Sequence, residues 1–240
     1  MSETFLDAAS NPQQYDLGEV DWRSDGNRQH FTRRMLLEAI LPHVRDVKDK
    51  EVLDIGAGHG WLCQELTERG ARTLGIEPSL QNVNAAREQF PALDFKHTSF
   101  GDFYHNRRYD LITATMVFEH MRSLPETFRK VRTLIRPAGR LAIVSGDFER
   151  FTAPRFGYAV DLEQIREGEV AARTDYGEPA GVIYDIIRTP HRFMVDAADA
   201  GLKTVAQQPY SIPDWVLQEQ PRYEQFEGKP VFQVLVFEPA

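Results

Sequence analysis

The sequence predicts an α/β protein with a doubly wound, mostly parallel sheet and helices on both faces. Between residues 51 and 145, apolar runs of strand length alternate at short spacing with amphipathic runs of helix length. This alternation is typical of βα units, whose parallel strands have helices packed on them. The last two apolar runs have no helical pattern between them, so we expect an antiparallel pair at one edge of the sheet.

The elements follow from apolar spacing. Residues 27–41 place Phe31, Met35, Leu36 and Ile40 at helical spacing, which predicts an amphipathic helix. Five apolar runs after it predict the parallel strands, and two more predict the final pair. The five strands are expected at 51–55, 72–76, 93–97, 109–116 and 140–145, and the last two at 202–207 and 231–238.

Sequence signals also mark the ends of the helices between these strands. Gly70 is expected to end a helix over 61–70, and Ser79 to cap a helix over 79–90. Three further signals lie later in the chain. They are a capping box at Ser123 and Glu126 that opens a helix running to about Arg136, a break at Pro137-Ala138-Gly139, and a helix start at Thr189-Pro190.

Length and composition favour one domain spanning residues 1–240. A chain of 240 residues can bury one substantial core. Its single cysteine, Cys63, cannot form an internal disulfide, and neither a secretion signal nor an apolar run of membrane-spanning length occurs. We therefore expect a soluble cytoplasmic protein with no membrane partner. The net charge of −8 gives no broad positive surface for nucleic acid.

Residues 52–66, VLDIGAGHGWLCQEL, carry the strongest functional signal. An apolar strand containing Asp54 runs into three glycines, and a helix follows at once. Glycines allow a tight turn and let a ligand lie against the backbone, at the strand ends where open α/β sheets bind ligands. Glu77 ends the second strand about 20 residues after Gly56, the spacing of an acid that holds ribose hydroxyls. The pattern favours a nucleotide-like ligand over a tight turn without one.

The position of Asp54 narrows the kind of ligand. A dinucleotide site would have the spacing G-x-G-x-x-G, with a helix N-terminus facing a pyrophosphate. Here the spacing is D-x-G-x-G-x-G, with Asp54 two residues before Gly56. A carboxylate at this point suits a ligand with an amino group and a positive centre better than it suits a phosphate.

Four segments together resemble class I S-adenosylmethionine-dependent methyltransferases. They are VLDIGAGHG, GIEPS, YDLITATMVFEHM and LIRPAGRLAIVS, within residues 50–146. The short segment FEHM, residues 118–121, is similar to ubiquinone-biosynthesis-like O-methyltransferases and their small-molecule relatives. The resemblance implies S-adenosyl-L-methionine as cofactor. It also implies a seven-stranded sheet with strand order 3-2-1-4-5-7-6, the last strand antiparallel.

The resemblance also implies a role for each loop at the carboxyl edge of the sheet. It places the methionine part of the cofactor on the glycine loop, the ribose at the end of the second strand, the adenine against the next two loops, and the sulfonium at the end of the fourth strand. The residues implied, in that order, are Asp54, Gly56, Ala57, Gly58 and Gly60; Glu77; Pro78, Ser99 and Phe100; and Ala114, Thr115 and Met116. Asp102 and Phe103 are an alternative register for Ser99 and Phe100, and Phe100 could equally be a core residue.

Two residues are candidates for catalysis. His120 follows the fourth strand, where a general base could act, although a histidine held by local hydrogen bonds is an equal alternative. Asp147 follows the fifth strand and could orient His120 or contact the acceptor. The sulfonium methyl is already activated, so alignment can supply most of the catalysis. We predict no metal, since Asp147 has no Asp-Asn pair near it.

The remaining segments are expected to build the acceptor side. Residues 147–188 are too long for a plain connection and predict a lid or helical insert with several aromatic side chains, and 189–240 supply the final helix and strands. Residues 1–49 are expected to be N-terminal cap helices, with Tyr15, Trp22 and Arg28 over the cofactor. An exposed Trp215 would suggest a pocket wall or a homodimer contact.

The sequence thus predicts methyl transfer from S-adenosylmethionine to the oxygen or nitrogen of a small organic acceptor. One alternative is a methyltransferase acting on protein or RNA. A second is a nucleotide-binding relative that keeps the loop and has lost catalysis, since fold does not fix function.

Overall fold

The computed structural model describes residues 4–11, 26–44, 46–177 and 181–240, with the backbone alone for 26–30. Tyr15, Trp22 and the side chain of Arg28, which we predicted to cover the cofactor, lie outside the described residues.

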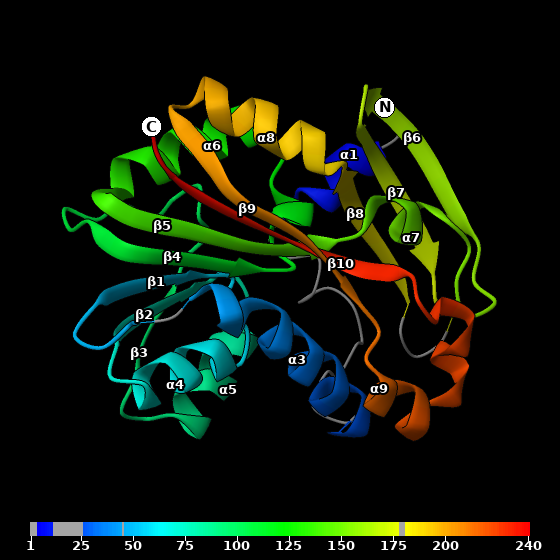
Figure 1. Cartoon of the computed structure of the whole chain (residues 1–240), viewed down its shortest axis with the longest axis horizontal. Coiled ribbons are helices and arrows are strands. Elements are labelled where there is room, and N and C mark those ends of the chain that lie inside the picture. The colour runs from blue at the N-terminus through cyan, green and yellow to red at the C-terminus, as the bar shows by residue number, and fades with distance from the viewer. Residues whose placement is uncertain (1–3, 12–25, 45, 178–180) are drawn as a thin grey trace.

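A seven-stranded sheet with the order β3-β2-β1-β4-β5-β10-β9 forms the centre of the molecule (Figure 1). Its strands are β1 (Glu51–Ile55), β2 (Arg72–Glu77), β3 (Asp94–His97), β4 (Tyr109–Thr115), β5 (Ile135–Gly146), β9 (Leu202–Ser211) and β10 (Pro230–Pro239). The first five are parallel, and β10 runs antiparallel to both β5 and β9. Counted within the sheet, this is the predicted order, and the predicted α/β fold class is confirmed.

Helices cover both faces of this sheet (Figure 1). On one face lie α3 (Gly26–Ile40), α4 (Trp61–Glu68) and α5 (Leu80–Gln89), and on the other α6 (Leu124–Leu134) and α8 (Pro190–Asp199). Consecutive β4 residues face opposite cores, since Leu111 packs in the cluster with α3 and Ile112 in the cluster with α6 and α8. Burial on both faces explains why the central strands are continuous apolar runs.

The predicted N-caps Ser79, Ser123 and Thr189 are confirmed, although of the predicted capping box at Ser123 and Glu126 the structure shows only the bond to the Ser123 hydroxyl, and one predicted break is wrong. The hydroxyls of Ser79, Ser123 and Thr189 accept hydrogen bonds from backbone amides three residues later. However, Pro137-Ala138-Gly139 lies inside β5, because the strand begins at Ile135 directly after α6. The pairing of β5 with β4 is irregular there, and an irregular start of a strand can hold a proline that lacks an N–H.

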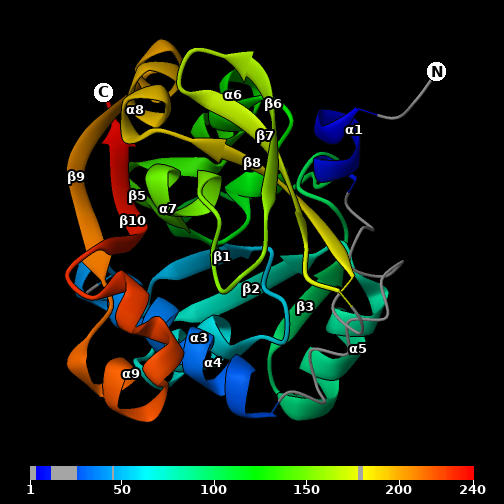
Figure 2. The same ribbon diagram turned by 90° about the vertical axis from the view of Figure 1, so that its right-hand side faces the viewer.

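The segment after β5 forms a second sheet, which corrects the alternative of a helical insert. Its strands β6 (Val160–Arg166), β7 (Glu169–Asp175) and β8 (Val182–Arg188) are antiparallel, and the one helix before them is α7 (Phe148–Thr152). The N-terminal α1 (Phe5–Ala9) packs on this sheet (Figure 2). The Phe5 ring lies 5.7 Å from the Tyr184 ring, and the Phe5 amide donates to Glu163 at 2.9 Å.

Trp215 lies on the short helix α9 (Asp214–Glu219), which packs against α3. The centre of the Trp215 ring lies 5.1 Å from the centre of the Phe31 ring and 3.6 Å from the Arg34 guanidinium. The Trp215 Nε1–H donates to Glu38 at 3.0 Å. The Trp215 side chain is half-buried, whereas a pocket wall or a homodimer contact was expected only for an exposed Trp215. These contacts hold α9 against α3.

Candidate active site

The glycine loop between β1 and α4 has one open position. Gly56, Gly58 and Gly60 all have positive φ angles, of 67°, 52° and 82°. A Cβ on Gly56 would lie 2.3 Å from Val117, and one on Gly60 2.5 Å from Phe95, whereas a Cβ on Gly58 would meet nothing within 4 Å. The first and third glycines are therefore needed for packing, and the second faces the space where a ligand can approach the backbone.

Asp54 lies under this loop as a buried acid. Its side chain is 2% exposed, and its carboxylate accepts a hydrogen bond from Thr113 at 2.7 Å and a weak one from Cys63 at 3.6 Å. Burial raises the pKa of Asp54 to about 7, against the lowering effect of these two bonds, and the charge of Glu77 raises it further. A ligand with a positive amino group would favour the ionised form.

Glu77 connects the end of β2 to the glycine loop. One carboxylate oxygen accepts the Gly58 amide at 3.0 Å, and the other accepts the Ser79 amide at 3.0 Å. The amides of Gly56 and Ala57 donate to the Ile76 carbonyl at 2.8 and 3.0 Å. The loop is thus held in shape from β2, with the acid beside its open position.

The residues predicted to contact adenine gather at the ends of β2 and β3. The Pro78 carbonyl accepts from His97 at 2.9 Å, and the Ser99 hydroxyl donates to Asp102 at 2.7 Å. Phe100 and Phe103 both lie in the main core cluster, at 5% and 2% exposure. Both registers thus place a phenylalanine in the core, and an adenine contact for Ser99 and Phe100 stays a prediction.

The end of β4 has an unusual backbone. Ala114 is fully buried, Thr115 ends the strand, and Met116 has a φ of 55° while its amide donates to the Val144 carbonyl at 2.8 Å. A positive φ is rare for a residue other than glycine and concentrates at functional sites. The observation agrees with the predicted place of Met116 beside the reacting centre.

His120 and Glu119 lie on the next turn, the 3-10 helix η2 (Phe118–His120). The His120 Nδ1 lies 3.3 Å from the Ala9 carbonyl of α1, and burial lowers the pKa of His120, which keeps the ring neutral at pH 7. Glu119 is 1% exposed and accepts from the Ser145 hydroxyl and the Gly146 amide, both at 2.7 Å. Sequence reasoning missed Glu119, although a carboxylate between Phe118 and His120 in an otherwise apolar run was the available signal.

Asp147 directly follows β5, as predicted, and its carboxylate also has a structural role in the next helix. It is the N-cap of α7, and its carboxylate accepts the Arg150 amide at 3.0 Å. Burial raises the pKa of Asp147. Its orientation of His120 or contact with an acceptor stays a prediction.

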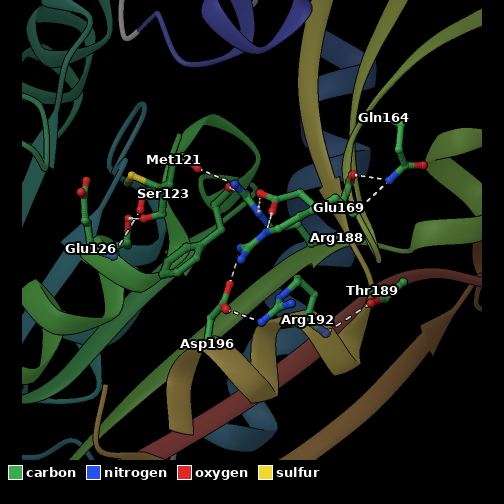
Figure 3. Close-up of polar contacts among 12 residues, drawn as sticks. Met121, Ser123, Glu126, Gln164, Glu169, Arg188, Thr189, Arg192 and Asp196 are labelled. Atoms are coloured by element: carbon green, nitrogen blue, oxygen red, sulfur yellow. Dashed lines mark hydrogen bonds and ion pairs between the residues drawn. The ribbon is translucent and has the colours of Figure 1, made fainter. Parts of the chain in front are cut away.

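A buried ion-pair network joins the second sheet to the turn after β4 (Figure 3). Arg188, 1% exposed, donates to the Phe118 carbonyl at 2.5 Å, the Met121 carbonyl at 2.6 Å and Glu169 at 2.7 Å. Arg166 bridges Glu169 to Asp196 of α8. The insert is therefore bonded to the segment that carries Glu119 and His120, and sequence reasoning did not find Arg188.

These residues fit S-adenosylmethionine. Gly58 leaves open space against the backbone, Asp54 provides a buried acid that an amino group can ionise, and Glu77 provides acceptor oxygens at the end of β2. Such a site belongs to class I S-adenosylmethionine-dependent methyltransferases, whose sheet order the chain also has. Among the described residues, no helix is long and apolar enough to span a membrane.

Comparison with known proteins agrees with this class. The sequence profile of the methyltransferase domain matches residues 25–205, and the chain belongs to this methyltransferase-domain family.

Among curated proteins, a ubiquinone biosynthesis O-methyltransferase of Rhodopseudomonas palustris (strain BisB5) is 32% identical over 98 residues, which is 39% of each chain. A second, from strain BisA53, is 26% identical over 156 residues, covering 56% of this chain and 62% of that one. The first alignment thus spans about two fifths of the length of the curated relative.

Two solved structures show the same fold. An S-adenosylmethionine-dependent methyltransferase from Mesorhizobium loti superposes with a TM-score of 0.69 at 15% identity, covering 86% of this chain and 99% of that one. The 1,6-didemethyltoxoflavin-N1-methyltransferase of Burkholderia thailandensis, with bound 1,6-didemethyltoxoflavin and S-adenosylhomocysteine, superposes with a TM-score of 0.65 at 13% identity, covering 100% of this chain and 92% of that one.

Proposed function

We propose that this protein transfers a methyl group from S-adenosylmethionine to the oxygen or nitrogen of a small organic acceptor. The observation that carries the proposal is the open face of Gly58, bordered by the carboxylates of Asp54 and Glu77. The similarity to ubiquinone biosynthesis O-methyltransferases, and the fold shared with a toxoflavin N-methyltransferase, support a small acceptor.

The chemistry is a displacement at carbon. S-adenosylmethionine held by these residues would supply a methyl group on a positive sulfur; transfer to the acceptor's lone pair would leave the electron pair of the carbon–sulfur bond on sulfur. The acceptor's O–H or N–H proton must leave to a base or to solvent. The protein's main task is to hold the acceptor in line with the methyl group and to exclude water.

Within this function we assign cofactor contacts to the predicted loop residues and the proton-accepting role to His120. With Nδ1–H donating to the Ala9 carbonyl, the neutral ring carries its lone pair on Nε2. His120→Ala should then lower turnover by roughly 10²- to 10⁴-fold with cofactor affinity intact. A variant that loses stability but keeps its turnover per folded molecule would show that His120 serves packing alone.

The cofactor half of the proposal is tested by calorimetry with S-adenosylhomocysteine. Glu77→Ala should weaken binding by roughly 1–3 kcal/mol, because it removes charged acceptors at the end of β2. Glu68→Ala, on the exposed end of α4, is the matched control. Preferential binding of NAD would contradict the proposal.

The acceptor half is tested with S-adenosylmethionine labelled on its methyl group. Label should enter the small molecules of a metabolite extract. Transfer into a protein or RNA fraction would favour a macromolecular acceptor, and binding of S-adenosylhomocysteine with no transfer to either would favour a non-catalytic relative. A homodimer stays a prediction, to be checked by light scattering.

A further inference from the structure

Two arginines beside the end of β5 lack the acidic partners that three neighbouring arginines have. Arg188 pairs with Glu169, and Arg166 and Arg192 pair with Asp196. Arg150 and Arg155, by contrast, form no ion pair with any carboxylate in the described part of the chain. Burying a guanidinium without an anion is unfavourable, so such a pair calls for a negatively charged partner.

Arg155 is fixed with its guanidinium against the inner face of the second sheet. It is 6% exposed and donates to the Phe151 carbonyl at 2.8 Å, the Tyr176 hydroxyl at 2.9 Å and the Thr174 hydroxyl at 3.3 Å. The three partners are a backbone carbonyl and two hydroxyl groups, so none of these hydrogen bonds is to a carboxylate. The position of the guanidinium is nevertheless well defined, which a binding group requires.

Arg150 lies on α7 and retains an unused donor. Its Nε is buried and has no hydrogen-bond partner, while its guanidinium lies 3.6 Å from the centre of the Phe226 ring. The Arg150 guanidinium also donates to the carbonyl of Pro154, the residue before Arg155, at 3.2 Å. Burial lowers the pKa of Arg150, and the charge of Arg155 lowers it further. An aromatic ring against one side leaves the edge of the guanidinium for a planar or tetrahedral anion.

Two carboxyl groups are close enough to this pair to interact electrostatically, but form no ion pair with it. Asp147 lies near Arg150, but its bond is to the Arg150 amide. Asp185 on β8 is 7% exposed and near enough to Arg155 for the arginine to lower its pKa, yet burial dominates and raises that pKa to about 6. Neither acid forms an ion pair within the described residues, so the arginines keep their capacity for an external anion.

Arg155 lies near the carboxyl end of β5, at the sheet edge that carries the proposed methyl-transfer site. The Phe151 ring packs on the last residue of β5, since a Cβ on Gly146 would lie 2.7 Å from it, and Arg155 lies 4.8 Å from that ring. Phe156, directly after Arg155, has a φ of 54°, an uncommon conformation that concentrates at functional sites. Arg155 thus lies at the same edge of the sheet as the proposed site, on the side where the second sheet follows β5.

We infer that Arg150 and Arg155 bind a negatively charged group, a carboxylate or a phosphate, on the methyl acceptor. The acceptor is then a small organic anion whose charged end lies between α7 and the second sheet, with the aromatic rings of Phe151 and Phe226 along its apolar part. This inference rests on the proposed function and names the substrate class of the same site.

The test does not require the acceptor to be identified first. A metabolite extract is separated at pH 8 on an anion-exchange resin, and each fraction is incubated with the protein and methyl-labelled S-adenosylmethionine. The methyl-accepting activity should be retained by the resin. Treatment of the active fraction with alkaline phosphatase then distinguishes the sources, since loss of activity identifies a phosphate and its survival a carboxylate. Activity in the unretained fraction would overturn the inference.

A variant tests the residues themselves with the active fraction as substrate. Arg150→Met should raise the apparent KM by about tenfold or more, with kcat and S-adenosylhomocysteine affinity retained, and Arg150→Lys should restore part of the loss. Arg136→Met, at an exposed pair with Asp110, is the control. An unchanged KM in folded Arg150→Met would contradict the inference. If no fraction accepts label although S-adenosylhomocysteine binds, the proposed function itself fails.

Discussion

Gly56 and Gly58 share a left-handed backbone, but their surroundings differ. Alanine at either position carries a conformational cost of about 1–2 kcal/mol. Gly58→Ala should add nothing to that cost, because its Cβ meets no atom, yet it should abolish S-adenosylhomocysteine binding by filling the open face. Gly56→Ala should lose further stability through its clash with Val117. Urea unfolding and calorimetry on both variants measure this, and intact binding in Gly58→Ala would show that the ligand lies elsewhere.

The pKa of Asp54 gives a pH dependence. Because burial raises it to about 7, the folded protein keeps a proton that the unfolded chain releases above about pH 4. This contribution to stability is full at low pH and is lost as the pH rises through 7. Between pH 5 and pH 8, the unfolding free energy of the wild type should therefore fall by roughly 2 kcal/mol relative to Asp54→Asn. Parallel pH curves for the two proteins would contradict the assignment.

At the scale of elements, the contribution of Arg188 can be measured by its removal. Arg188→Met leaves the Phe118 and Met121 carbonyls without their donor and removes one partner of buried Glu169. We expect a loss of roughly 3–5 kcal/mol in the unfolding free energy. Arg173→Met, which breaks the pairs of Arg173 with the exposed Asp161 of β6 and Asp175 of β7, should lose less than about 1 kcal/mol. Equal losses in the two variants would show that burial of Arg188 contributes nothing.

The same scale shows what the sequence can and cannot predict. Strands such as β1 and β2 were located to within a residue, because their short apolar runs are bounded by the glycine loop after β1 and by Pro78 after β2. The β6–β8 sheet was not predicted. Residues 169–172 are buried on both faces of β7, but α1, which covers one face, comes from the far N-terminal end of the chain. No local pattern reports such a contact.

The residues of the candidate site also fall into those that the sequence predicted and those that it did not. Asp54, Gly58 and Glu77 follow one another at fixed spacing across a single βαβ unit, so the motif alone placed them together. The hydrogen-bond partners of the other buried residues are 19 to 70 positions away in the sequence: Ser145 for Glu119, Thr174 for Arg155 and Phe118 for Arg188. Their roles depend on tertiary structure, which periodicity does not encode.

At the scale of the whole molecule, cofactor binding should raise the free energy of unfolding and therefore the thermal midpoint. A ligand at 100 times its dissociation constant stabilises the folded state by about 2.7 kcal/mol. For a chain of this size the thermal midpoint should rise by roughly 5–10 °C with S-adenosylhomocysteine. NAD at the same concentration is the control and should leave the midpoint unchanged. A larger shift with NAD would contradict the cofactor assignment.

The Arg188 network also sets a condition for making chimeras with other methyltransferases. The insert leaves the core after Gly146 and returns at Arg188, so exchanging residues 147–188 looks like a replacement with two junctions. In such a chimera, however, Arg188 would need carbonyl acceptors in the recipient protein at the positions of Phe118 and Met121. The unit to transplant is therefore the insert together with residues 118–121 and the first turns of α8, where Asp196 meets Arg166.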